Sequence, residues 1–211
     1  MSLGHVHTGH FHTAPGHPEG RVAAWVGEIP IAASEVDVHL EQLRAGPRAA
    51  LLPVAHSSEG RQLRRWATQV VVTRRLLEIE ASALGPGDAP PVEAVMPDRE
   101  AALELGGVVA NVLANSGPAR RVFAEVTGSV QASSRDVTDY YARNQDEFPS
   151  PDGQTRSLEA VAEDIERKLT SSLRRRCFVD WLDPLRARLV RLEPGHEHPG
   201  DPRQPDATHR H

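Results

Sequence analysis

The sequence predicts a mainly helical protein with one folded body, a short strand near each end of that body and a polar tail beyond each strand. Two long segments, residues 61–84 and 158–182, repeat apolar side chains at helical spacing. Short apolar segments at 22–31 and 187–192 suit strands. With 211 residues, the chain is long enough for one substantial core.

Composition narrows the classes of function. Hydrophobic residues make up 39% and charged residues 25%, which is ordinary for a soluble domain. A net charge of -5 provides no basic field for phosphates, so neither nucleic acid nor a membrane surface is expected as a partner. The single cysteine, Cys177, rules out an internal disulfide. Because Met1–His5 lacks the pattern of a signal peptide and no apolar run is long enough to span a bilayer, a cytoplasmic location is expected.

Capping and breaking residues divide the first half of the chain. Ser34 is expected to cap a helix that ends at Gly46-Pro47. The long helix over 61–84 carries so wide an apolar stripe that it should be buried against several partners. Residues 85–97 are rich in glycine and proline and are expected to form a loop.

The second half follows the same logic. Asp98 is expected to cap a helix that runs until residues 116–118 interrupt it, and a shorter helix follows. Residues 133–136 form a capping-box pattern that opens another helix. Ser157 is expected to cap the last helix, which Pro184 should end or kink.

Three passages resemble the chaperone module of the SurA, PrsA and trigger-factor-like group. Trp-Val-Gly-Glu-Ile-Pro-Ile at 25–31, followed by Ser-Glu-Val-Asp at 34–37, is similar to that group's opening strand, turn and first helix. The Tyr-Tyr pair, the Asn and the closing Phe within 135–148 resemble the helix that enters the isomerase domain of the family. The segment 158–190 resembles the long helix and returning strand that follow that domain.

The resemblance implies a SurA-like helical module over residues 21–192, in which strands near 22–26 and 188–192 pair antiparallel and join the two ends. The family's parvulin domain would lie between the second and third passages. Here only a short loop at 149–157 separates them, so prolyl-isomerase activity is not expected, and this loop should lie far from the paired strands. The alternative is an unrelated small helical domain.

Histidines are concentrated in two tails, residues 1–20 and 193–211, which hold nine of the eleven. In an extended chain residues i and i+2 point to the same side, so a His-x-His pair can offer two imidazoles to one ion. Nitrogen and oxygen ligands favour Zn(II), Ni(II) or Cu(II). The alternatives are a solvated tail or a purification tag, and the tails should contribute little to the core. The expected ligands form four pairs: His5 and His7, His10 and His12, His196 and His198, His209 and His211.

The hypothesis for function is a non-catalytic chaperone-like protein, with tails that bind a divalent transition metal. Its partner would be an unfolded or a specific client protein, and it could also form a homo-oligomer. An apolar groove between helices would hold a peptide or a partner helix, although the same side chains could simply belong to the core. The expected groove residues are large and apolar or aromatic: Trp66, Val70, Phe123, Tyr140, Tyr141 and Trp181.

Two other classes of function stay open. The first is a metallochaperone or metal-storage protein for Zn, Ni or Cu, in which the helical body only docks on a target. The second is an enzyme of unidentified type: residues 194–202 resemble the ending of uncharacterised actinobacterial proteins, some labelled malonyl transacylases. The chain has no GxSxG motif to support that label, and no catalytic residue is expected. Cys177 is interpreted as a buried core residue rather than a reactive thiol.

Overall fold

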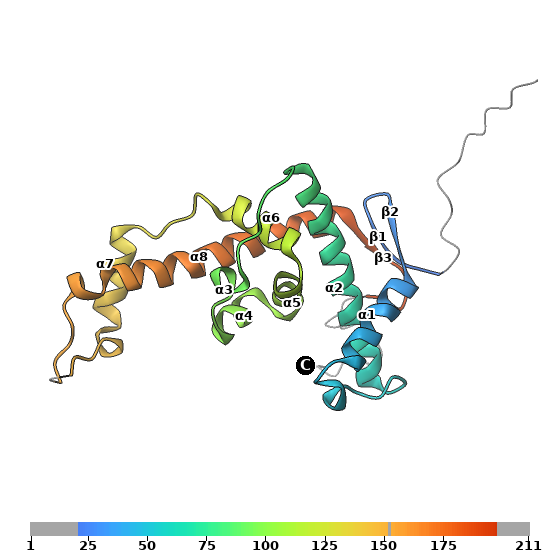
Figure 1. The fold of residues 1–211 in the computed structure, drawn as a ribbon, viewed down its shortest axis with the longest axis horizontal. Helices are drawn as coiled ribbons and strands as arrows, with labels where there is room; N and C mark the ends of the chain where they lie inside the picture. Colours follow the sequence, from blue (N-terminus) through green and yellow to red (C-terminus); the bar gives the residue numbers. More distant parts are fainter. Residues whose placement is uncertain (1–20, 152, 198–211) are drawn as a thin grey trace, which may run out of the picture.

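A computed structural model describes residues 21–151 and 153–197, and this part of the chain is mainly helical with one small antiparallel sheet (Figure 1). The sheet has the strand order β2-β1-β3, so the C-terminal strand lies beside the first strand. Trp25 is paired with Arg191, which confirms the predicted pairing of the two ends of the body. The strands are β1 (Val22–Val26), β2 (Ile29–Ala32) and β3 (Val190–Leu192).

Ten helical segments fill the described ranges between the second and third strands. Most of the predicted helices are present, with changed bounds. The two longest, α2 and α8, correspond to the two segments with the strongest apolar periodicity. The segments are α1 (Ala33–Ala45), η1 (Ala49–Leu51), α2 (Ser58–Ala83), α3 (Val92–Val95), α4 (Arg99–Leu105), α5 (Gly107–Asn115), α6 (Gly117–Thr127), α7 (Ser134–Arg143), η2 (Gln145–Glu147) and α8 (Leu158–Leu189).

The first helix begins one residue before the predicted cap. Ala32, still in the extended conformation of β2, takes the N-cap position, so the prediction of Ser34 as the cap is wrong. The Glu35 carboxylate accepts a hydrogen bond of 3.0 Å from the Ala32 amide and so satisfies one of the free donors of the first turn. Strand and helix therefore follow each other without a linker.

The middle of the chain is more broken than predicted. The expected loop at 85–97 contains the short helix α3. The helix that Asp98 caps ends at Leu105, because Gly106 takes a φ of 76° that no α-helix contains. α4 and α5 are consequently two short helices with different directions.

Pro184 does not end the last helix, which continues to Leu189. A proline inside a helix costs about 3 kcal/mol, because it removes one hydrogen bond and crowds the preceding turn. Leu182 and Leu185, on either side of it, are buried in the main core, and each contributes about 2 kcal/mol through that burial. Burial of these neighbours offsets the break in hydrogen bonding.

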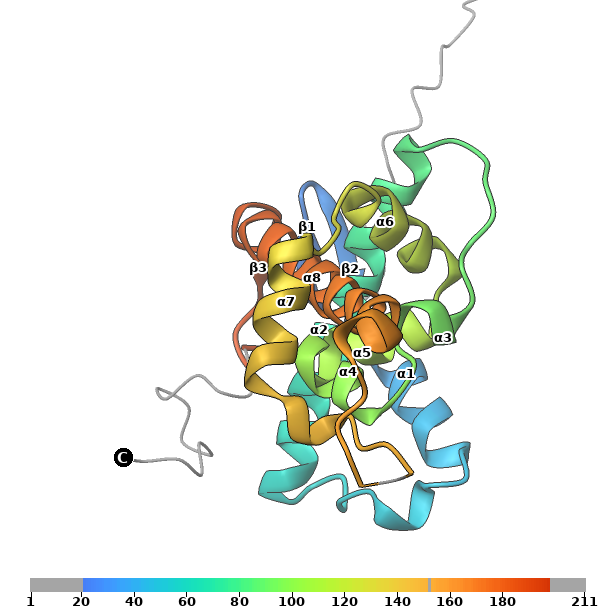
Figure 2. The same cartoon turned by 90° about the vertical axis from the view of Figure 1, so that its left-hand side faces the viewer.

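Three apolar clusters divide the described residues into what we call the body and the arm. The body is the sheet, α1 to α6 and the C-terminal part of α8. It packs around a main core that includes Leu76 and Phe178 and, under α1, a small cluster that includes Val36 and Ala67. The arm is α7, η2 and the N-terminal part of α8, held by Val137, Val161 and Ile165. α8 runs from one to the other, and the link between α7 and α8 lies at the end of the molecule opposite the sheet, as predicted (Figures 1 and 2).

No helix within residues 21–151 and 153–197 combines the length and the apolar character needed to cross a membrane.

Gly60 in the first turn of α2 gives a direct test of this packing. A Cβ at this position would lie 2.1 Å from the Val54 carbonyl oxygen, so we expect Gly60→Ala to lower the free energy of unfolding by about 2 kcal/mol or more. The matched control is Gly107→Ala at the start of α5, whose Cβ would meet only Trp66 Nε1 at 3.7 Å. Urea unfolding should show the control unchanged or stabilised by up to about 1 kcal/mol. Equal effects of the two substitutions would contradict the described path of residues 54–60.

Candidate functional site: a cleft between body and arm

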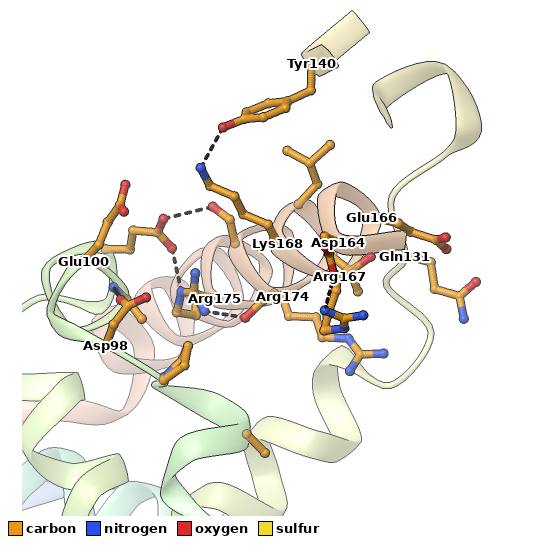
Figure 3. A pocket seen from close by; sticks show the side chains of 18 of the residues that line it. Asp98, Glu100, Gln131, Tyr140, Asp164, Glu166, Arg167, Lys168, Arg174 and Arg175 are labelled. Atoms are coloured by element: carbon orange, nitrogen blue, oxygen red, sulfur yellow. Dashed lines mark hydrogen bonds and ion pairs between the residues drawn. The ribbon is translucent and has the colours of Figure 1, made fainter. Parts of the chain in front are cut away.

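An open cleft of about 990 Å³ lies along α8, where the body and the arm diverge (Figure 3). The body contributes residues of α3 and α4 and Phe123 of α6, and the arm contributes Tyr140 and Glu147. Residues of α8 between Glu163 and Arg175 form the wall that both parts share. The cleft is therefore built by three segments that are far apart in the sequence.

The body side of the cleft is fixed by an ion pair between the buried Arg175 and the partly exposed Glu104. The Arg175 side chain is only 7% exposed, and its Nε donates to the Glu104 carboxylate over 2.5 Å. Arg175 also donates to Ser171 Oγ over 2.6 Å, and Ser172 Oγ donates to the same carboxylate over 3.1 Å. Because a buried guanidinium without a partner would be costly, Glu104 holds α4 firmly against α8.

On the arm side, three polar side chains join α7, η2 and α8. Lys168 Nζ donates to Tyr140 Oη over 2.6 Å and to Glu147 Oε2 over 3.1 Å, and Tyr140 Oη donates to the same Glu147 oxygen over 2.7 Å. The hydrogen bond to Tyr140 is the main cause that raises the pKa of Lys168 to about 12, and Glu147 adds to it. The hydroxyl of Tyr140, followed by the charge and hydrogen bond of Lys168, lowers the pKa of Glu147. Both groups are therefore charged at neutral pH.

Negative charge predominates along the cleft, whose lining holds eight carboxylates and four cationic side chains. Each cation has a partner inside the protein. Besides Lys168 and Arg175, Arg167 is paired with Asp164 at 2.9 Å, and Arg174 Nε donates to the Val130 carbonyl over 3.1 Å. Four of these carboxylates have no ion-pair partner among the described residues. Asp98 accepts a hydrogen bond of 2.8 Å from the Ala101 amide at the start of α4, which leaves Glu93, Glu100 and Glu166.

The six predicted groove residues do not form one surface. Val70 and Phe123 are 2% and 5% exposed and belong to the main core, while Trp66 and Trp181 pack against that core half-buried. Tyr140 and Tyr141 belong to the cluster of the arm. Of the six, Phe123 and Tyr140 line the cleft. For Val70 the structure supports the alternative interpretation as a core residue.

Sequence reasoning missed the acidic lining. Glu93, Glu100 and Glu104 fall within twelve residues of one another, and Glu163, Asp164 and Glu166 are clustered in the same way on α8. This density of acidic residues was the available signal. Nothing in the sequence shows that the two groups face one cleft, because this depends on how α4 packs on α8.

Seven of the eight predicted metal ligands lie outside the described residues: His5, His7, His10, His12, His198, His209 and His211. His196 is described, and it is only 4% exposed. The residues before His196 continue along β1. The Glu193 amide donates to the Ala23 carbonyl over 3.0 Å, and the Glu193 carboxylate accepts from Trp25 Nε1 over 2.9 Å. The chain therefore packs on the body through His196, whereas the sequence predicted a tail from Glu193 onward.

The contacts of His196 orient its ring. Nδ1 lies 3.2 Å from Thr68 Oγ1, which is also 3.0 Å from the Arg64 carbonyl oxygen. Thr68 has one hydroxyl hydrogen, which it donates to the Arg64 carbonyl oxygen. Thr68 Oγ1 therefore accepts from His196 Nδ1, and Nε2 carries the lone pair of the ring. Within residues 21–151 and 153–197, no three His, Cys, Asp or Glu side chains are grouped to hold a metal ion. A metal site that includes His196 would therefore need at least one ligand from outside these residues.

The environment of His196 predicts a pH dependence of stability. Burial lowers its pKa, and Arg64 of α2 and Arg21 before β1 act in the same direction, against the smaller opposite effects of Glu197 and of Asp37 on α1. The unfolded chain therefore takes up the proton first as the pH falls below about 6.5, and the free energy of unfolding decreases from there downward. Burial, followed by Arg74, lowers the pKa of His39 too, which adds to the same trend.

Urea unfolding between pH 5 and 7.5 should therefore show a smaller loss of stability on acidification in the variant His196→Gln than in the unchanged protein. The matched control is His56→Gln, because His56 is exposed in the loop before α2. The control should keep the full pH dependence. Identical pH profiles for all three proteins would contradict the buried position of His196.

A model of one protein family, described as a family of unknown function (DUF7158), matches residues 22–59. No curated protein matches the chain. No solved structure matches it either. The matched stretch contains β1, β2, α1 and η1 and ends just after the start of α2, and none of the residues that line the cleft lies within it. The chain is thus similar to that family at its first two strands and its first helix.

Proposed function

We propose that this protein is a non-catalytic, chaperone-like binding protein that holds a segment of a client polypeptide in the cleft between body and arm. The observation that carries the proposal is the cleft itself, which is open and has a volume of about 990 Å³. Binding sites of this size combine apolar surface with a few placed polar groups. Here Ala94, Phe123 and Leu169 supply apolar surface beside the hydrogen-bonding groups of α8.

The construction of the cleft also supports the proposal. Its two sides belong to different apolar clusters, so each side has a core of its own and the cleft lies open between them. The Arg175–Glu104 ion pair holds one side, and the Lys168–Tyr140–Glu147 contacts hold the other. The resemblance of residues 22–192 to the SurA and PrsA group agrees with this proposal.

The second candidate function is binding of Zn(II), Ni(II) or Cu(II) by the histidine pairs, as in a metallochaperone or storage protein. One observation favours it. The bond from Nδ1 to Thr68 favours the His196 tautomer in which Nε2 carries a lone pair, as outer contacts do in metal-binding histidines. His198, two residues further on, would be the next ligand.

A variant that fills the cleft tests the first proposal. Ala94 is exposed and lines the cleft, so Ala94→Trp should occupy part of it without disturbing the core. Ala83, exposed at the end of α2 and outside the cleft, gives the matched control Ala83→Trp. We expect the unchanged protein and the control to suppress light scattering of a chemically denatured client at a one-to-one ratio, and Ala94→Trp to suppress it less. No suppression by the unchanged protein would contradict the proposal.

Calorimetric titration tests the metal proposal. Since an imidazole must lose its proton to bind, affinity should rise from pH 5.5 to 7.5, with Cu(II) bound more tightly than Ni(II) or Zn(II). Replacing His196 and His198 by Ala should weaken binding. It should also cost on the order of 1 kcal/mol of stability, because the contact with Thr68 is lost. Unchanged affinity and stoichiometry in that variant with residues 1–17 also deleted would contradict metal binding by the tails.

A further inference from the structure

We infer that the cleft selects cationic peptide segments, whose Lys or Arg side chains pair with Glu93, Glu100 and Glu166 while apolar neighbours contact the cleft surface. The inference rests on the proposed function and specifies its client class. It follows from three properties of the lining: which charges are already paired, where the unpaired ones lie, and what a ligand of opposite charge would have to displace.

The first property is the pairing of charges. Glu104, Glu147 and Asp164 are satisfied by cations of the protein. Glu93, Glu100 and Glu166 are exposed and have no such partner in the described chain. The cleft thus presents negative charge that the fold itself does not use, and a bound cation would complement it.

The second property is the placement of these carboxylates. Glu93 and Glu100 come from α3 and α4 on the body side, whereas Glu166 comes from α8 near the arm. In Figure 3 the labelled Glu100 and Glu166 lie well apart, with turns of α8 and its labelled Lys168 and Arg175 between them. An extended segment across the cleft would meet a free carboxylate near each end. Two separated basic side chains therefore suit this site better than a single cation.

The third property is the cost of binding the opposite charge. An anionic segment would need cations, but Arg167, Arg174, Arg175 and Lys168 already donate to groups of the protein. Releasing Arg175 would leave Glu104 and a buried guanidinium unpaired, which is expensive. An anionic ligand would also meet three unpaired carboxylates. The lining therefore disfavours anionic segments by repulsion as well as by lack of donors.

Fluorescence anisotropy with synthetic peptides tests the inference. Three labelled eight-residue peptides would share their Phe and Leu positions and differ at two positions, which carry Lys, Gln or Glu. The variant removes the free charges by Glu93→Gln, Glu100→Gln and Glu166→Gln together. The matched control makes the same change in net charge outside the cleft, by Glu28→Gln, Glu41→Gln and Glu125→Gln, at positions that are all exposed and outside its lining.

We expect the Lys peptide to bind most tightly and the Glu peptide most weakly. The affinity of the Lys peptide should fall about eightfold in the cleft variant, on the order of twofold for each exposed charge removed. In the control variant its affinity should stay unchanged. Added salt should weaken binding of the Lys peptide more than binding of the Gln peptide. Equal affinity for all three peptides, or equal losses in the two variants, would overturn the inference while leaving peptide binding in place. No binding of any peptide, together with no suppression of client aggregation, would overturn the proposed function as well.

Discussion

The two halves of α8 are buried in different apolar clusters, and this determines how the described part of the chain is arranged. Phe178 and Leu182 anchor the C-terminal half in the body, and Val161 and Ile165 anchor the N-terminal half in the arm. The turns of α8 between these anchors are covered completely by neither the body nor the arm, so they cannot carry apolar side chains on every side. Polar side chains such as Lys168 and Arg175 occupy them, and the cleft forms along this stretch. The two-part architecture and the candidate site thus have a common cause.

Charge then gives the cleft its character. The helix supplies cations in its middle, and residues from α4 and η2 neutralise them, which fastens both walls to the same helix. Glu93, Glu100 and Glu166 take no part in such pairs. The most exposed apolar side chains lie elsewhere, at Leu51 and Val54 in the connection between α1 and α2, where they are 81% and 72% exposed. That connection is the principal competing surface for an apolar client.

Local signals predicted much of this fold, and their failures have physical causes. Periodicity located α2 and α8, and the Ser133–Asp136 capping box marked the start of α7, because these features depend on near neighbours. The pairing of β1 with β3 followed from a resemblance rather than from local pattern. Of the two predicted effects of Pro184, ending the helix is wrong, because long-range burial of adjacent leucines outweighs a local break. The contact of His196 with Thr68 and the convergence of acidic groups in the cleft join distant segments, which periodicity cannot reveal.

Photo-cross-linking can show where a client contacts the protein. A denatured client carrying a photoreactive amino acid would be cross-linked to the unchanged protein, and the cross-linked residues would be identified by mass spectrometry. If the client binds in the cleft, we expect cross-links on both of its sides, within residues 93–104 and 163–175. Cross-links confined to the connection at 49–54 or to the sheet would contradict binding in the cleft.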